Sequence, residues 1–263
     1  MPGRAARFRL QCKAKPHGLD VFSSTPADDH QARKHLLPYG GGALRRRDPP
    51  VRVQKLAAAH DIARDGERIS QCCLILEGWA YRYKILGEGK RQIFSFHIDG
   101  DIPDLQSLHI PLMDHSLATM TPVTVAFIPH QAMRDLTDRF PRIAAALWRD
   151  TLVDAGIFRE WMMCMGRRSA YNHVAHLLCE LYRKQEAVGL AGEHRCPLPM
   201  TQLDLADATG LSNVHVNRVL QEMRGKGLIT LRGNTLVIQA WDELVRAAEF
   251  DDAYLHLRKR AAG

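Results

Sequence analysis

The spacing of apolar residues along the chain changes near Pro129. From about Val51 to Pro129 the apolar residues come in short runs rich in Ile, Val, Phe and Tyr, separated by turns that contain glycine. Runs of this length predict antiparallel strands in a sandwich or barrel. Within them, "ILGEGKRQIF" predicts a hairpin, because Gly87 and Gly89 accommodate the positive φ angles of a tight turn.

A long amphipathic helix is predicted from Pro141 to about Met165, where apolar residues recur at steps of three and four. A helix of roughly 24 residues is about 36 Å long, which exceeds what a small barrel covers. We therefore expect part of its apolar stripe to meet a second subunit. The alternative is that the barrel and the C-terminal domain bury the whole stripe. The expected dimer contacts are Leu147, Trp148, Leu152, Ala155, Phe158 and Met162.

A further helix is predicted in "SAYNHVAHLLCELYRKQEAVG", which carries one apolar face and ends at Gly189. The connector "HRCPLPM" follows, as a strand or an irregular link. The apolar face consists of Val174, Leu177, Leu178 and Leu181.

Two short helices joined by a tight turn are predicted after this connector. The first spans Gln202 to Thr209, with Leu203, Leu205 and Ala206 as its apolar positions and with Asp204 and Asp207 facing solvent. Gly210 is suited to end it in a left-handed conformation, and Ser212 to cap the second helix. The buried side of the second helix is expected to consist of Leu211, Val216, Val219, Leu220 and Met223.

The outer side of the second helix carries amide and guanidinium groups, with His215 on its flank. Asn pairs bidentately with adenine and Arg with guanine in the major groove, so this helix is typical of a recognition helix. The following "GLITLRGNTLVIQ" predicts a β-hairpin wing whose Arg232 is placed to contact a phosphate. The alternative is a structural helical hairpin with a solvated polar face. The outward residues are Asn213, Val214, Asn217, Arg218 and Gln221.

Composition and charge agree with this interpretation without deciding it. The 263 residues, 46% of them hydrophobic, suffice for one large or two modest domains, and a net charge of +7 is compatible with a nucleic-acid partner. No apolar run has the length of a signal peptide or of a membrane span, so we expect a cytoplasmic protein without a membrane partner. Residues 1–43 lack periodicity and predict a disordered basic arm.

The six cysteines have irregular spacing and form no C-x-x-C motif, so we expect neither a disulfide framework nor a metal site. No nucleophile and base pairing or phosphate-binding loop is evident, so we expect no catalytic residue and no enzyme activity. The competing function is a ligand-binding or enzymatic barrel whose C-terminal helices are only structural.

The segments "GRRSAYNHVAHLLCEL" and "LPMTQLDLADATGLSNVHVNRVLQEMRGKGLI", with the hairpin after them, resemble the C-terminal half of the Crp/Fnr family of transcriptional regulators. The hairpin-rich segment with "GDI" at Gly100 resembles the cyclic-nucleotide-binding-type β-barrel of that family. The likeness covers about residues 44–257 and is most specific over 166–238.

This resemblance implies an α+β protein: a jelly-roll β-barrel sensor domain over residues 44–140, a dimerisation helix over 141–165, a winged helix-turn-helix domain over 166–250, and a tail over 251–263. It also implies a homodimer that binds double-stranded DNA at a palindromic site, with recognition helices about 34 Å apart, and that contacts RNA polymerase. The DNA-binding residues would be Thr201, Gln202, Ser212, Asn213, Val214, His215, Asn217, Arg218 and Arg232.

One base-facing position departs from the family pattern. Many members carry Glu where this chain has Val214, and valine packs on a thymine methyl but accepts no hydrogen bond from cytosine. The family pattern therefore does not fix the half-site that this chain prefers, although DNA binding as such is still expected.

The signal sensed by the barrel is not evident from the sequence. Members of the family that bind cyclic AMP use an arginine for its phosphate, but "GDIPDLQSLHIPLMDHSLATMT" contains none, so we predict no cyclic-nucleotide response. A four-cysteine iron-sulfur cluster is not expected, since the N-terminal arm contains only Cys12. We assign no cofactor, although haem on His97, His109 or His115 stays an alternative.

Thiol chemistry is the remaining option for sensing. Cys164 lies near Arg167 and Arg168 in the sequence, and neighbouring cations lower the pKa of a thiol and favour its oxidation. The competing interpretation is that this thiol packs as a small apolar side chain.

Overall fold

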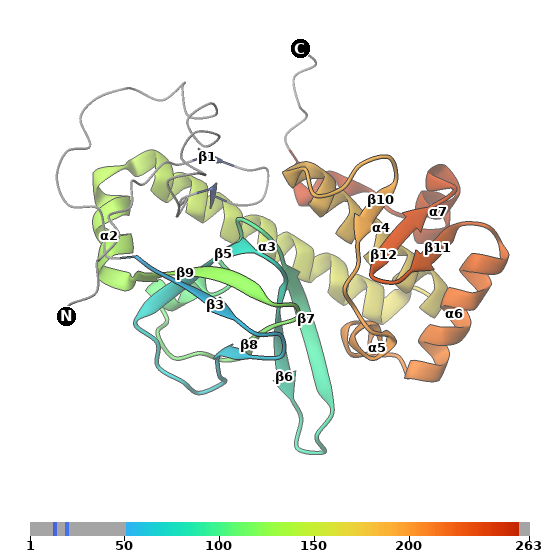
Figure 1. The fold of residues 1–263 in the computed structure, drawn as a ribbon, viewed down its shortest axis with the longest axis horizontal. Helices are drawn as coiled ribbons and strands as arrows, with labels where there is room; N and C mark the ends of the chain where they lie inside the picture. The colour runs from blue at the N-terminus through green and yellow to red at the C-terminus, as the bar shows by residue number, and fades with distance from the viewer. Residues whose placement is uncertain (1–12, 15–18, 21–50, 258–263) are drawn as a thin grey trace, which may run out of the picture.

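The computed structural model describes residues 13–14, 19–20 and 51–257, which form a sheet-rich N-terminal domain and a helical C-terminal domain (Figure 1). A long helix runs from the first domain toward the second. Within the predicted N-terminal arm, strands β1 (Lys13–Ala14) and β2 (Leu19–Asp20) pair antiparallel. The rest of that arm, including Cys12, lies outside the described residues.

The N-terminal domain is a jelly-roll-type barrel of two antiparallel sheets packed face to face, in agreement with the sandwich or barrel that the sequence predicts. One sheet has the strand order β3-β9-β5 and the other β4-β8-β6-β7. Their facing sides share an apolar core that includes Ile75, Leu117 and Val125. The strands are β3 (Arg52–Leu56), β4 (Asp61–Ala63), β5 (Gln71–Glu77), β6 (Ala80–Ile85), β7 (Arg91–His97), β8 (Ser116–Thr119) and β9 (Val123–Pro129).

The predicted hairpin is the connection between β6 and β7. Its turn closes through a hydrogen bond from the Leu86 amide to the Lys90 carbonyl, 2.8 Å long. Of the two glycines expected to take a positive φ angle, only Gly89 does so, at +78°. A short 3-10 helix, η2 (Leu105–Leu108), lies between β7 and β8.

Two helices follow the barrel, of which the sequence predicts only the second. Helix α2 (His130–Arg139) begins directly after β9. Helix α3 (Pro141–Arg167) has 27 residues, slightly more than expected, and starts with its proline in the first turn. Its inner face packs against both domains. The buried residues on this face include Leu147, Val153, Ile157, Trp161 and Cys164.

The C-terminal domain contains the predicted winged helix-turn-helix. Helices α4 (Ala170–Val188), α5 (Gln202–Thr209) and α6 (Asn213–Gly225) surround an apolar core, and each is capped at its N-terminus by a hydroxyl. Strands β11 (Ile229–Arg232) and β12 (Thr235–Ile238) form the wing, and the connector strand β10 (Arg195–Pro197) joins them to complete the order β10-β12-β11.

The chain after the wing packs onto the same domain. Helix α7 (Trp241–Ala248) contacts α4, and η3 (Asp252–Leu255) contacts both α3 and α4. Leu255 is completely buried, so the segment predicted as a tail is part of the fold as far as Leu257. Among the described residues, no helix combines the length and the apolar character that crossing a membrane requires.

Candidate nucleic-acid interface and sensor interior

The turn between α5 and α6 has the geometry predicted for it. Gly210 ends α5 in the left-handed region, at a φ angle of +69°, which glycine adopts without steric cost. The Ser212 hydroxyl then accepts a 3.2 Å hydrogen bond from the His215 amide and caps α6. Val216, Val219, Leu220 and Met223 are buried, as expected, so the orientation of α6 about its own axis is fixed.

The front of α6 projects away from the protein. Asn213, Asn217 and Arg218 are exposed, Val214 is 80% exposed, and His215 is half-buried on the flank. Within residues 51–257, no hydrogen bond or ion pair engages the side chains of Asn213, Asn217 or Arg218. Their donors and acceptors are therefore available to a partner outside the subunit.

The remaining residues of the predicted set lie at the start of α5 and in the wing. The Thr201 hydroxyl accepts a 3.1 Å hydrogen bond from the Asp204 amide, and the Asp204 carboxylate accepts one from the Thr201 amide, which forms a capping box. Gln202 is half-buried. Arg232 is exposed at the end of β11, next to the turn of the wing.

The prediction that the outer face of α5 is exposed to solvent was wrong. Asp204 and Asp207 do not face solvent but form ion pairs with Arg91 of the barrel, while Leu203 is 55% exposed. The reason is that α5 packs against β7 as well as α6, a contact that periodicity within α5 does not reveal.

The outer face of α3 carries an apolar stripe that the subunit leaves uncovered. Trp148 is 66% exposed, Leu152 51%, Phe158 38% and Met162 69%. Ala155 is half-buried. The alternative in which one subunit buries the whole stripe is therefore excluded. Leu147, however, is buried against η2, α2 and β5 residues and was wrongly placed on the dimer face.

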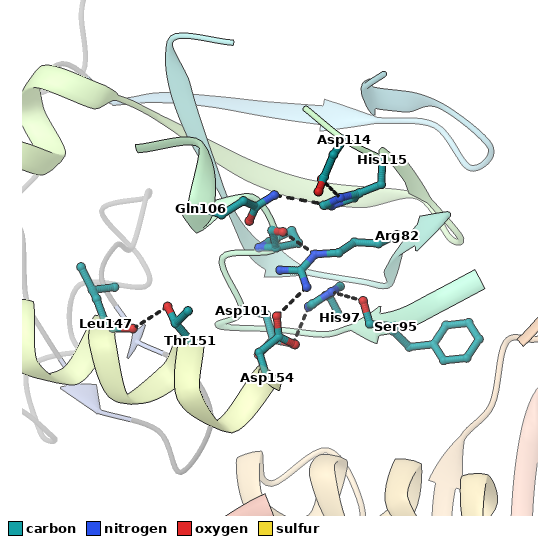
Figure 2. Close-up of polar contacts among 12 residues, drawn as sticks. Arg82, Ser95, His97, Asp101, Gln106, Asp114, His115, Leu147, Thr151 and Asp154 are labelled. Carbon is teal, nitrogen blue, oxygen red and sulfur yellow. Dashed lines mark hydrogen bonds and ion pairs between the residues drawn. The ribbon is translucent and has the colours of Figure 1, made fainter. Parts of the chain in front are cut away.

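The interior of the barrel contains an arginine that the sequence interpretation missed. Figure 2 shows Arg82 reaching from β6 toward Asp154 of α3, to which it donates a 2.5 Å hydrogen bond. Its Nε also donates to the Pro103 carbonyl, at 2.6 Å. The alternation in "AYRYKI" was a usable signal, because it places Arg82 on the opposite face of the strand from Tyr81 and Tyr83.

Carboxylates dominate the surroundings of Arg82. Asp104 is buried and accepts a 2.7 Å hydrogen bond from the Cys73 amide, and its burial raises its pKa to about 7. Burial, together with the charges of Asp101 and Asp154, raises the pKa of Asp150 to about 8. The interior is therefore a poor environment for a further anion.

The histidines considered as haem ligands are engaged within the barrel or exposed. His97 Nε2 lies 2.8 Å from the Ser95 hydroxyl, its Nδ1 lies 3.5 Å from Asp101, and burial lowers its pKa to about 4. His115 is paired with Asp114 and Gln106, whereas His109 is exposed. This arrangement does not favour His97 or His115 as an axial ligand.

The thiol of Cys164 does not have the lowered pKa that its sequence neighbours suggested. The side chain is 1% exposed, and burial raises its pKa to about 11 even though Arg168 donates a hydrogen bond to Sγ. Arg167 is exposed. Burial outweighs the nearby cation, which favours the interpretation in which this thiol packs as a small apolar side chain.

Comparisons with known proteins agree with this division of the chain. Residues 53–140 match the model of a cyclic nucleotide-binding domain, and residues 172–247 match that of a Crp-like helix-turn-helix domain. The two matches coincide with the barrel and with the domain that carries α6.

Proteins named as regulators match this chain over most of their length. The nitrogen fixation regulation protein FixK of Rhizobium meliloti (strain 1021) is 25% identical over 222 residues, which cover 84% of this chain and 89% of that protein. The regulatory protein HlyX of Actinobacillus pleuropneumoniae is 26% identical, with 80% and 85% covered. The solved structure of FixK2 from Bradyrhizobium japonicum superposes with a TM-score of 0.69 at 23% identity, covering 75% of this chain and 96% of that one.

Proposed function

The chain belongs to the Crp/Fnr family of transcriptional regulators, and from this premise we propose that it binds a palindromic operator as a homodimer. In this proposal the barrel is the sensor domain, α3 is the dimerisation helix, and the winged helix-turn-helix binds DNA. The dimer then acts on transcription by contacting RNA polymerase. The boundaries of the three parts lie near residues 140 and 167, and the DNA-binding domain extends to Leu257.

The observation that carries the proposal is the exposed front of α6. Its amide and guanidinium groups have no partner among residues 51–257, and they stand on a helix whose other face is fixed by packing. A helix of this kind fits the major groove, where Arg218 is suited to guanine and Asn213 or Asn217 to adenine. Val214 is suited to a thymine methyl group.

The uncovered stripe of α3 supports the dimer. Trp148, Leu152 and Met162 are large apolar side chains on one helix, and each is more than half exposed in the single subunit. A continuous exposed apolar face of this kind marks an interaction site. Pairing two copies of α3 buries the stripe and sets two recognition helices side by side, as a palindromic site requires.

We further propose that the sensed signal is not a cyclic nucleotide. The guanidinium inside the barrel is already neutralised by Asp154, and Asp101, Asp104 and Asp150 lie around it. A cyclic phosphate placed there would have to replace an existing ion pair, in an interior where the raised pKa values of Asp104 and Asp150 show that negative charge is disfavoured.

Selection of bound duplexes from a random DNA pool tests the function directly. The proposal expects a recovered palindrome with half-site centres about one helical turn apart, and binding that weakens steeply as salt concentration rises. Recovery of no sequence preference, with equal binding of all duplexes, would contradict it.

A further inference from the structure

One side chain of the barrel binds two carboxylates of the DNA-binding domain in the same subunit. Arg91, the first residue of β7, donates from Nη2 to Asp204 and from Nε to Asp207, both at 2.7 Å. Asp204 and Asp207 lie three residues apart on α5 and thus on one face of that helix. A single guanidinium therefore bridges two points on α5.

Tyr81 of β6 fixes the position of this guanidinium from the barrel side. Its hydroxyl accepts a 3.0 Å hydrogen bond from Arg91 Nη1, and its ring centroid lies 5.2 Å from the Arg91 Cζ atom. The side chains of the ion pairs are largely shielded, with exposed fractions of 24% for Arg91, 15% for Asp204 and 17% for Asp207. Shielded, charge-assisted bonds of this kind are stronger than surface ion pairs.

Further contacts extend the same junction. Gln92 donates from Nε2 to the Ala208 carbonyl at the end of α5, and Lys184 of α4 donates to the Phe96 carbonyl of β7 at 2.9 Å. Around these bonds, Trp79 and Phe96 of the barrel belong to the same apolar cluster as Leu205 of α5. The domains are thus joined by a packed contact with Arg91 at its outer edge.

The two carboxylates differ in what else they do. Asp204 also accepts hydrogen bonds from the Thr201 amide and hydroxyl, so a change at Asp204 would disturb the capping box of α5. Within the described part of the chain, Asp207 binds through its side chain only to Arg91. Asp207 therefore allows the contact to be broken without affecting the N-terminus of the helix.

We propose that Arg91 is an interdomain clamp that sets the direction of the recognition helix, and that the clamped arrangement is the one that binds DNA. Helix α5 packs directly on α6, so fixing α5 to the barrel also fixes α6. In this arrangement neither the front of α6 nor the apolar stripe of α3 is covered by the subunit. Both surfaces that a dimeric DNA-binding protein needs are available at the same time.

The clamp is expected to affect binding to a palindrome with two half-sites, but not binding to a single half-site. A dimer binds a palindrome with both domains, so a domain that moves freely must be ordered on binding, at a cost in affinity. A single half-site needs no fixed relation between the two recognition helices. This inference rests on the proposed function, because it assumes a dimer on a palindrome.

The test compares full-length Asp207→Asn, Arg91→Gln and their combination with the unmodified protein. The control is Arg64→Gln, which like Arg91→Gln removes one positive charge but breaks an ion pair with Asp61 at the surface of the barrel domain. Fluorescence anisotropy measures binding to the selected palindrome and to the same duplex with one half-site scrambled. Hydrogen exchange followed by mass spectrometry measures protection of α5 and β7 without DNA.

The clamp variants are expected to lose about tenfold in affinity for the palindrome, with half-site affinity unchanged. The double variant should lose no more than Arg91→Gln alone, because Asp207 binds only Arg91 among the described residues, and Arg91→Lys, which keeps the charge but not the bridging geometry, should lose less than Arg91→Gln. In the exchange experiment, α5 and β7 should lose protection in the clamp variants and keep it in Arg64→Gln.

Unchanged or tighter palindrome binding by Asp207→Asn would overturn the assignment of the clamped arrangement as the DNA-binding one. Unchanged exchange in α5 would overturn the clamp itself. If the unmodified protein binds no DNA sequence specifically, the proposed function fails, and the exchange measurement alone then decides whether Arg91 couples the domains.

Discussion

Arg82 of β6 and Asp154 of α3 form an ion pair, 2.5 Å between Nη1 and Oδ2, that joins the barrel to the long helix (Figure 2). Only 7% of the Arg82 side chain is exposed, compared with 27% of Asp154. Although burial opposes ionisation of Asp154, the Arg82 charge holds its pKa below the ordinary value. The pair thus connects the sensor domain to the helix that carries the exposed apolar stripe.

Removing one partner of this pair is expected to destabilise the protein strongly. Arg82→Leu leaves Asp154 without its cation and should lower the free energy of unfolding by about 3–5 kcal/mol, measured by urea denaturation. The double variant Arg82→Leu with Asp154→Leu should recover part of this loss, because it leaves no uncompensated charge. Equal stability of Arg82→Leu and the unmodified protein would show that the pair contributes little.

Cyclic AMP and cyclic GMP are expected to show no micromolar binding in isothermal titration calorimetry. The physical reason is that Arg82 is already paired with Asp154 and that the raised pKa of buried Asp104 shows an interior that disfavours a further negative charge. The variant Asp154→Asn frees the guanidinium and serves as the comparison. Micromolar binding by the unmodified protein would contradict the prediction.

Two arginines of the DNA-binding domain are expected to act differently on sequence preference. Arg218→Ala should cost about 1–3 kcal/mol of binding free energy on the selected palindrome and relax the preference at one base pair of each half-site. Arg232→Ala, in the wing, should weaken binding to all sequences alike. Anisotropy titrations against duplexes changed at single positions measure both. A uniform loss for Arg218→Ala would assign it to the DNA backbone instead.

Because the exposed stripe of α3 is apolar, a single charged substitution in it is expected to disrupt the dimer. Trp148→Glu places a carboxylate on the exposed apolar face of α3 and should weaken dimerisation at least about a hundredfold in sedimentation equilibrium. The matched control is Ile110→Glu, which changes an apolar residue that is 64% exposed but lies outside the helix. A dimer unaffected by Trp148→Glu would place the subunit contact elsewhere.

The local elements were predictable because each depends on its own residues. Gly210 and Ser212 determine the turn of the helix-turn-helix through a left-handed glycine and a hydroxyl cap, and both occur where the sequence predicts them. The alternation of apolar and polar positions in α6 was sufficient to separate its buried side from its exposed front.

The contacts between domains were not predictable in the same way. Asp204 and Asp207 appear as polar positions of a short helix, and only the approach of β7 brings Arg91 to them. Leu147 belongs to the same apolar periodicity as Trp148, yet η2 and α2 cover it in the subunit. Periodicity along one helix shows that a residue is apolar, but not which neighbour buries it.

Acid sensitivity is expected from a histidine of α4 that is buried against α3 and η3. His176 is 1% exposed, lies 3.1 Å from the Tyr254 hydroxyl and 3.7 Å from Glu160, and stacks on the Tyr254 ring. Burial, followed by the charge of Arg168, lowers its pKa to about 3. The folded protein therefore holds His176 neutral where the unfolded chain, with a pKa near 6.5, takes up a proton.

Because its pKa is lowered in the folded state, neutral His176 adds fully to the free energy of unfolding above about pH 6.5. This stabilisation is lost as the pH falls toward 3. When the pH is lowered from 7 to 4.5, the free energy of unfolding should therefore decrease in both proteins, but by about 2 kcal/mol less in His176→Gln than in the unmodified protein. Urea denaturation at the two pH values measures this difference, and His109→Gln, an exposed position, is the control. Equal losses in His176→Gln and the unmodified protein would show that other groups, such as His97 or His173, carry the acid sensitivity.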